Sequence, residues 1–176
     1  LERIGADAVI AEGCESGGHI GEMTTMTLIP QTVDAVDIPV IAAGGIADHR
    51  QMQAVLTLGA CGAQIGTALL AAEECPIHEN YKEAVLKAQG SDTIVTGRIG
   101  GTPVRVLKNQ MSREYVKREK AGEDRMELEK FTLGSLRRAV FEGDTKNGSF
   151  MAGQSCGQLK EIRPVAEILA EICRGI

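Results

Sequence analysis

The sequence predicts an α/β fold in which short buried strands alternate with helices and run parallel to one another. Four short apolar runs lack polar alternation, which is typical of strands buried on both faces of a sheet. Segments with helical spacing separate these runs, and strands recur about 30 residues apart twice over, the length of a β-α unit. We therefore expect four β-α units, with strands at residues 8–11, 40–43, 63–65 and 93–95.

Each expected strand ends in small or turn-forming residues. The first strand stops at Glu12-Gly13, the second at Gly44-Gly45, the third at Gly66-Thr67, and the fourth near Thr96-Gly97. In parallel β-α folds, ligand-binding and catalytic groups lie just past the carboxyl ends of the strands. These turns are therefore the first places to look for a site.

The helices between the strands are indicated by apolar spacing and by capping residues. In the clearest case, residues 48–58, Met52, Val55 and Leu56 recur at i, i+3 and i+4. Asp48 is a natural N-cap for this helix, and Gly59 supplies its C-cap. The other helices of this part are expected at residues 30–36 and 80–88.

The pattern changes after Gly101 to charge-rich helices, expected at residues 112–120 and 127–140. A loop at 149–157 and an amphipathic helix at 164–174 follow. We expect residues 1–110 to hold the strands and glycine-rich turns, and residues 111–176 to form a helical, closing segment of the same domain.

Composition and charge exclude several classes of function. The chain has 176 residues and a net charge of −5, with aromatic residues at 3% and no Trp. It therefore offers neither a broad cationic field for a phosphate backbone nor platforms for stacked bases, so nucleic acid is not expected as a partner. No apolar run approaches the roughly 20 residues that span a bilayer, so we expect no membrane association and a cytoplasmic location. The five cysteines have no zinc-like spacing, which indicates reduced thiols and no metal site.

Two of the glycine-rich turns are candidate phosphate sites. Gly44-Gly45 and Gly66-Thr67 place backbone N–H groups at the starts of expected helices, and Thr67 adds a hydroxyl. The alternative is that these are plain turn glycines. A third turn, residues 12–21, does not match the Gly-x-Gly-x-x-Gly fingerprint, which argues against a Rossmann fold.

Three motifs together resemble a known enzyme family. They are residues 8–26, with Glu12-Gly-Cys-Glu-Ser-Gly-Gly-His-Ile-Gly21 at their centre, residues 38–48, and residues 148–155. They closely resemble the flavin-dependent enoyl-acyl-carrier-protein reductases II, within the wider nitronate monooxygenase (2-nitropropane dioxygenase-like) family. The resemblance implies an eight-stranded β/α barrel of the TIM type, bound FMN, and reduction of a trans-2-enoyl thioester by NADH or NADPH. It further implies an acyl carrier protein as partner, and we expect a homodimer.

The resemblance also implies that the chain corresponds to the C-terminal half of such a barrel, because members of the family are about twice as long. The first four β-α units of the barrel, with a Gly-Gly-Met segment that contacts the flavin, are then absent from these residues. An inactive half-barrel, which exposes strand edges and so dimerises or aggregates, is one alternative function. A nitronate monooxygenase is the other.

The resemblance assigns roles residue by residue. His19 matches the catalytic histidine; from the residues alone, a histidine that caps a loop is the alternative. The positions that match flavin-binding residues are Glu12, Gly17 and Gly18 in the first loop, Gly44 and Gly45 in the phosphate turn, Gln64, Ile65, Gly66 and Thr67 in the second phosphate turn, and Met151, Gln154 and Ser155 in a closing loop. This chain has Thr67-Ala68-Leu69 where the family usually has Thr-Arg-Phe. Arg98, Arg105 and Lys108 are candidates either for anion contacts with the carrier protein or nicotinamide or for surface salt bridges.

Overall fold

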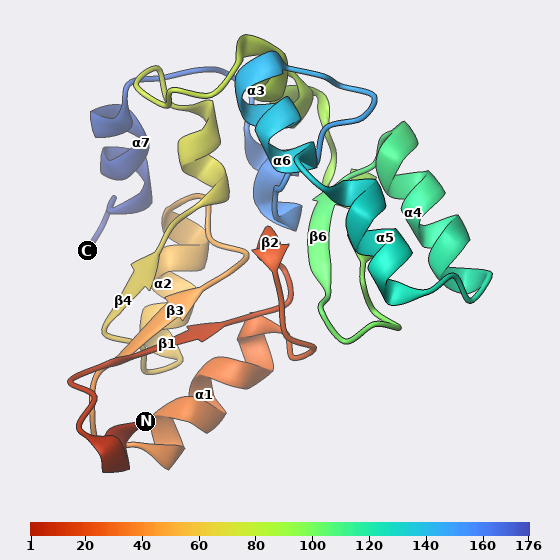
Figure 1. Cartoon of the computed structure of the whole chain (residues 1–176). Helices are drawn as coiled ribbons and strands as arrows, with labels where there is room; N and C mark the ends of the chain where they lie inside the picture. The colour runs from red at the N-terminus through yellow and green to blue at the C-terminus, as the bar shows by residue number, and fades with distance from the viewer.

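The computed structural model describes residues 1–176 and contains a parallel sheet at the N-terminal end of the chain (Figure 1). Strands β1 (Val9–Glu12), β3 (Val40–Ala43) and β4 (Gly62–Gln64) lie side by side in that order. Glu12 is opposite Ala43, and Ala43 is opposite Gln64, so the carboxyl ends of the three strands meet at one edge. The prediction of parallel strands at these three places is confirmed.

The prediction of a fourth parallel strand is wrong. Residues 93–95 lie in β5 (Thr93–Thr96), which pairs antiparallel with β6 (Val104–Leu107) in a second sheet of order β2-β6-β5. The two-residue strand β2 (Gly18–His19) completes this sheet. Parallel strands need a long crossover, usually a helix, whereas a short glycine-containing loop joins β5 to β6. The first sheet therefore holds three parallel strands instead of four.

Helices α1 (Thr25–Ala35) and α2 (His49–Thr57) pack on the parallel sheet, and α7 (Val165–Ile172) packs against α2. The helix expected at residues 30–36 begins earlier, and Pro30 lies inside it. The reason is a tertiary contact: the Glu15 carboxylate accepts hydrogen bonds from the N–H and the hydroxyl of Thr25. A carboxylate at this position is favourable for a helix start because unpaired N–H groups point towards it.

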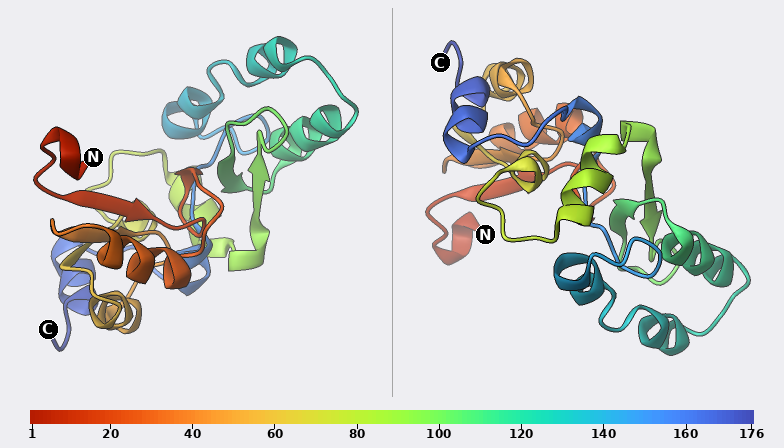
Figure 2. Two further views of the ribbon diagram at one scale, coloured as in Figure 1. Left: turned by 90° about the horizontal axis from the view of Figure 1, so that it is seen from below. Right: turned by 90° about the horizontal axis from the view of Figure 1, so that it is seen from above.

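The helices of residues 110–132 lie beside the antiparallel sheet and apart from α1, α2 and α7, as the two views of Figure 2 show, whereas the helix of residues 79–87 shares a buried apolar group with α7. The single helix expected at residues 127–140 is interrupted at Gly134, which has a φ of 73° that a side chain would disfavour. No helix of the chain has both the length and the apolar character that a bilayer crossing requires. Besides α1, α2 and α7, the α-helices of the chain are α3 (Glu79–Lys87), α4 (Gln110–Lys120), α5 (Arg125–Thr132) and α6 (Ser135–Arg137). A π-helical turn covers Arg138–Glu142, and 3-10 turns cover Glu2–Ile4, Thr67–Ala71, Gly90–Asp92 and Gln154–Gln158.

Two groups of buried apolar residues hold the elements in place. One lies between the parallel sheet and its helices and includes Ile29 and Val55. The other lies around α3 and the chain after residue 149, where the rings of Tyr81 and Phe150 are 4.6 Å apart. Met52 and Ile65 pack against both groups. The loop after Phe150 is thereby fixed near the carboxyl edge of the parallel sheet.

Asp48 caps α2 as predicted, and its removal has a testable cost. Its carboxylate accepts from the Arg50 N–H at 2.8 Å, while the Gln51 side chain accepts from the Asp48 N–H. We expect Asp48→Ala to lower the free energy of unfolding by about 1 kcal/mol, the usual cost of losing an N-cap. Denaturant unfolding at neutral pH measures this, with Asp48→Asn as a control that keeps a capping oxygen.

The same cap predicts a pH dependence. Hydrogen bonds from Arg50 hold the pKa of Asp48 below its usual range. A lowered pKa in the folded state adds stability above the unfolded pKa, and this stability is lost as the pH falls through the folded pKa. The stability difference between wild type and Asp48→Asn should therefore be constant above about pH 5 and shrink below about pH 4. A difference that persists unchanged in acid would contradict this origin.

Candidate functional site

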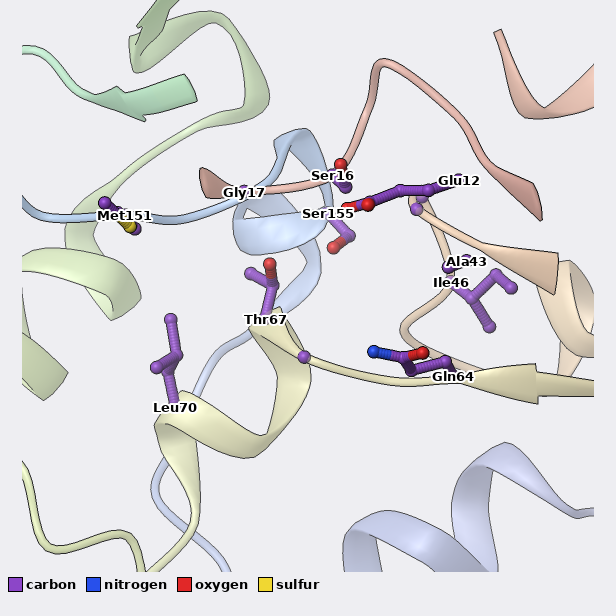
Figure 3. A pocket seen from close by; sticks show the side chains of 13 residues that line it. Glu12, Ser16, Gly17, Ala43, Ile46, Gln64, Thr67, Leu70, Met151 and Ser155 are labelled. Carbon is purple, nitrogen blue, oxygen red and sulfur yellow. The ribbon is translucent and has the colours of Figure 1, made fainter. Parts of the chain in front are cut away.

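A cavity of about 260 Å³ opens at the carboxyl edge of the parallel sheet, where the glycine-rich turns meet (Figure 3). We call it the glycine cavity. In the close-up, Glu12 reaches in from the end of β1, and Thr67 and Gln64 approach from the opposite side. The lining residues are Glu12, Ser16, Gly17, Ala43, Gly44, Gly45, Ile46, Gln64, Gly66, Thr67, Leu70, Met151 and Ser155.

Most of the predicted flavin-binding residues are thus brought together, but three of them do not line the glycine cavity. Gly18 is paired with Arg105 in the second sheet. The Ile65 side chain packs into the two apolar groups. Gln154 is exposed, and its N–H donates to the Glu15 carbonyl.

The free backbone donors lie in the turn before α2 and not in the helix itself. Gly44 and Gly45 have φ values of 90° and 76°, and a Cβ at Gly44 would lie 2.7 Å from the Gly13 carbonyl oxygen. No backbone carbonyl accepts from the N–H groups of Gly44, Gly45 or Gly66. The start of α2, which the sequence had suggested as the source of donors, is already capped by Asp48. An anion in this cavity would therefore meet turn amides, as in a backbone nest.

Three hydroxyl groups add to the polar lining. The Ser16 Oγ is buried and has no hydrogen-bond partner, which is costly unless a ligand or water supplies one. The Thr67 Oγ1 accepts from the Gly153 N–H at 2.8 Å, which leaves the hydroxyl proton free to be donated elsewhere. Ser155 is buried at the same cavity. The Ser16 hydroxyl is therefore available to bond a polar ligand or a water in this cavity.

The loop that begins at Met151 closes one side of the glycine cavity. It is held by the Gly153 bond to Thr67 and by the Gln154 N–H, which donates to the Glu15 carbonyl at 2.8 Å. The Met151 carbonyl accepts from the Tyr81 hydroxyl at 2.7 Å. The backbone of this loop is therefore fixed on both of its flanks.

His19 lies at the end of β2 and lines a neighbouring cavity of about 350 Å³, not the glycine cavity. We call this second space the histidine cavity. Met151 lines both cavities, so the two are adjacent. The residues around it are His19, Thr96, Gly97, Gly100, Thr102, Val104, Tyr115, Arg125, Leu128, Glu129, Thr132, Gly134, Ser135, Leu136, Ser149 and Met151.

Arg105 is a structural residue and is not free to contact an anionic ligand. It is buried, and its Nε and Nη2 donate to the Cys14 carbonyl while its Nη1 donates to the Thr93 hydroxyl. Burial lowers the pKa of its guanidinium, which has no carboxylate partner. Arg105 therefore forms neither the anion contact nor the surface salt bridge considered from the sequence. Its hydrogen bonds connect the first glycine-rich loop to β5 instead. Lys108 donates to the Ser91 carbonyl.

Comparison with known proteins identifies the family of this chain. The family model for nitronate monooxygenase matches residues 1–175. The chain belongs to this family. A probable nitronate monooxygenase from Bacillus subtilis is 34% identical and covers 99% of this chain and 53% of its own length. A second, from Staphylococcus saprophyticus, is 36% identical and covers 88% of this chain and 46% of its own length.

Two solved structures match the fold. FabK from Thermotoga maritima superposes with a TM-score of 0.94 and 52% identity, over 97% of this chain and 54% of its own. Nitroalkane oxidase from Streptomyces ansochromogenes superposes with a TM-score of 0.80 and 34% identity, over 97% of this chain and 52% of its own. The chain therefore spans about half the length of the relatives that it matches.

Sequence reasoning missed four residues of the glycine cavity: Ser16, Ala43, Ile46 and Leu70. Ser16 lies between two predicted positions of one glycine-rich loop, so its place in the loop was a usable signal. Ala43 and Ile46 flank the Gly44-Gly45 turn. Leu70 carries no such signal, because its approach to the cavity depends on the 3-10 turn at Thr67–Ala71.

Proposed function

We propose that this chain forms part of an FMN-dependent reductase that reduces a trans-2-enoyl thioester of acyl carrier protein with NADH or NADPH. The observation that carries the proposal is the match to FabK, an enoyl-acyl-carrier-protein reductase II, at 52% identity. The nitroalkane oxidase and the Bacillus subtilis relative reach only 34%. Because the chain spans about half of these proteins, the activity belongs to a complete barrel of this kind.

The architecture supports a place within such a barrel. We propose that β1, β3 and β4 are neighbouring strands of an eight-stranded β/α barrel. Their carboxyl ends share the edge that carries the glycine cavity, as barrel enzymes require of an active site. The outer edges of β1 and β4 are where further strands would continue the barrel.

The glycine cavity fits an FMN phosphate by the kind of donor it offers. The N–H groups of Gly44, Gly45 and Gly66 are unused, and the Thr67 hydroxyl has a proton to donate. No Lys or Arg lines the cavity, so neutral donors would hold the phosphate. Glu12 would repel a phosphate and is better suited to accept from the hydroxyls of a ribityl chain. When bound, a flavin supplies the transfer of hydride from the nicotinamide to the β-carbon of the enoyl thioester.

His19 is the residue we propose for the proton that the α-carbon must receive. It lines the cavity next to the proposed flavin site, and imidazole is the side chain best suited to proton transfer near neutral pH. Polarising the thioester carbonyl is the other role open to the same imidazole. Both roles require the substrate to enter the histidine cavity.

A second candidate is nitronate monooxygenase, which the family model and the curated relatives favour. With a neutral nitroalkane as substrate, His19 would take the proton from the carbon beside the nitro group, which forms the nitronate. The fold and the flavin site would be the same, so the two candidates differ in substrate and in co-substrate, which is NADH or NADPH for the reductase and oxygen for the monooxygenase.

Two assays on the flavin-loaded protein separate these candidates. We expect NADH or NADPH to be consumed when a crotonyl or longer enoyl thioester is added. Oxygen uptake with a nitronate and without nicotinamide would instead favour the monooxygenase. A colourless protein without a flavin absorbance band, and with neither activity, would favour the inactive half-barrel.

A further inference from the structure

The histidine cavity has one cationic residue in its lining, and this residue lies at its outer rim. Arg125 is the only Lys or Arg among the lining residues. Together with Glu129 it also borders an open surface hollow that includes Asp124 and Met126. Met151, by contrast, borders the glycine cavity. The histidine cavity therefore runs from Arg125 near the surface towards Met151 beside the proposed flavin site.

The bonds that now hold Arg125 are weak enough to be exchanged. Its Nε donates to the Glu129 Oε1 at 2.8 Å, and its Nη1 reaches the Gly100 carbonyl at 3.4 Å. Both side chains of the ion pair are more than half exposed, at 64% and 63%. Exposed i, i+4 pairs of this type contribute little to stability. A guanidinium has five N–H donors, so the remaining ones are free to bind an incoming phosphate.

The lining between the two ends is neutral. Val104, Leu128 and Leu136 provide apolar surface, and Thr96, Thr132 and Ser149 provide hydroxyls. Such a mixture suits a long uncharged arm that carries amide groups and an apolar end. It does not suit a ligand with charges along its length, which would be left without partners inside the cavity.

We propose that Arg125 binds the phosphate of a phosphopantetheine arm, whose acyl end then extends through the histidine cavity to His19. The inference rests on the proposed function, because acyl carrier proteins present their thioesters on such an arm. A nicotinamide dinucleotide also carries phosphates, but it brings at least two charges to a rim that offers one cation beside Asp124 and Glu129. A single phosphodiester matches this rim better. Arg125 would thus select for phosphate-bearing substrates.

Binding of pantetheine and of the methyl phosphodiester of 4′-phosphopantetheine, which carries one charge like the arm on a carrier protein, to the flavin-loaded protein tests the proposal by calorimetry. We expect the phosphorylated compound to bind about tenfold more tightly, as one charge-assisted contact allows. Arg125→Met should remove this preference by weakening only the phosphorylated compound. Glu129→Gln should increase it, because Arg125 then loses its competing partner.

Lys130→Met is the matched control. Lys130 lies on the same helix and forms a similar exposed ion pair, with Glu127, but it does not line the histidine cavity. This variant should keep the preference. An unchanged preference in Arg125→Met would overturn the proposal, as would weaker binding of NADPH in that variant with no effect on the phosphodiester. If the preference depends on Arg125 but no enoyl thioester is reduced, the proposed function fails and the phosphate contact stands.

Discussion

Turnover of an enoyl thioester is expected to fall about 10²- to 10⁴-fold when His19 is replaced by alanine, the range that general acid–base catalysis contributes. Flavin binding should change little, because His19 lines the histidine cavity and not the glycine cavity. Nicotinamide oxidation with a crotonyl thioester measures the first quantity, and flavin absorbance of the purified variant measures the second.

A second substitution separates the two roles proposed for His19. His19→Gln keeps a hydrogen-bond donor that can polarise a carbonyl but cannot deliver a proton at neutral pH. Rescue of turnover by glutamine would show that the imidazole polarises the thioester, whereas equal loss in both variants would show that it donates a proton. His78→Ala serves as the control, because His78 caps α3 away from both cavities. Normal turnover in His19→Ala would end the assignment.

The parallel part of the fold could be predicted because its signals are local. Apolar runs that stop at glycine mark β1 and β3, and Asp48 marks the start of α2. Since the carboxyl ends of parallel strands share an edge, the turns after these strands were expected to lie together, and they do at the glycine cavity.

What the sequence could not supply depends on contacts between distant residues. β5 has the composition of a buried parallel strand, and only its pairing with β6 makes it antiparallel. The start of α1 is set by Glu15, which lies in another loop. The division of the site into two cavities that share Met151 likewise follows from packing. The motif therefore identified His19 as a candidate residue but could not predict which cavity it lines.

Gly17 is a position where a single added methyl group is expected to displace the loop beside the glycine cavity. A Cβ there would lie 2.6 Å from the Ala152 carbonyl carbon and 2.7 Å from the Gly153 nitrogen. These are backbone atoms, so no side chain can rotate away and the whole segment must shift. We expect Gly17→Ala to lower the free energy of unfolding by about 1–3 kcal/mol, the usual cost of overpacking. Denaturant unfolding measures this cost.

The same shift should weaken flavin binding. Moving Ala152 and Gly153 strains the bond from the Gly153 N–H to the Thr67 hydroxyl and displaces Met151 from its place between the two cavities. Flavin affinity, measured by fluorescence titration, is expected to fall about tenfold, the equivalent of one lost hydrogen bond. Gly21→Ala is the matched control, because a Cβ at Gly21, in the same loop, meets nothing within 4 Å. If Gly17→Ala and Gly21→Ala have the same free energy of unfolding and the same flavin affinity, then the contact of Gly17 with Ala152 and Gly153 does not position the loop that separates the two cavities.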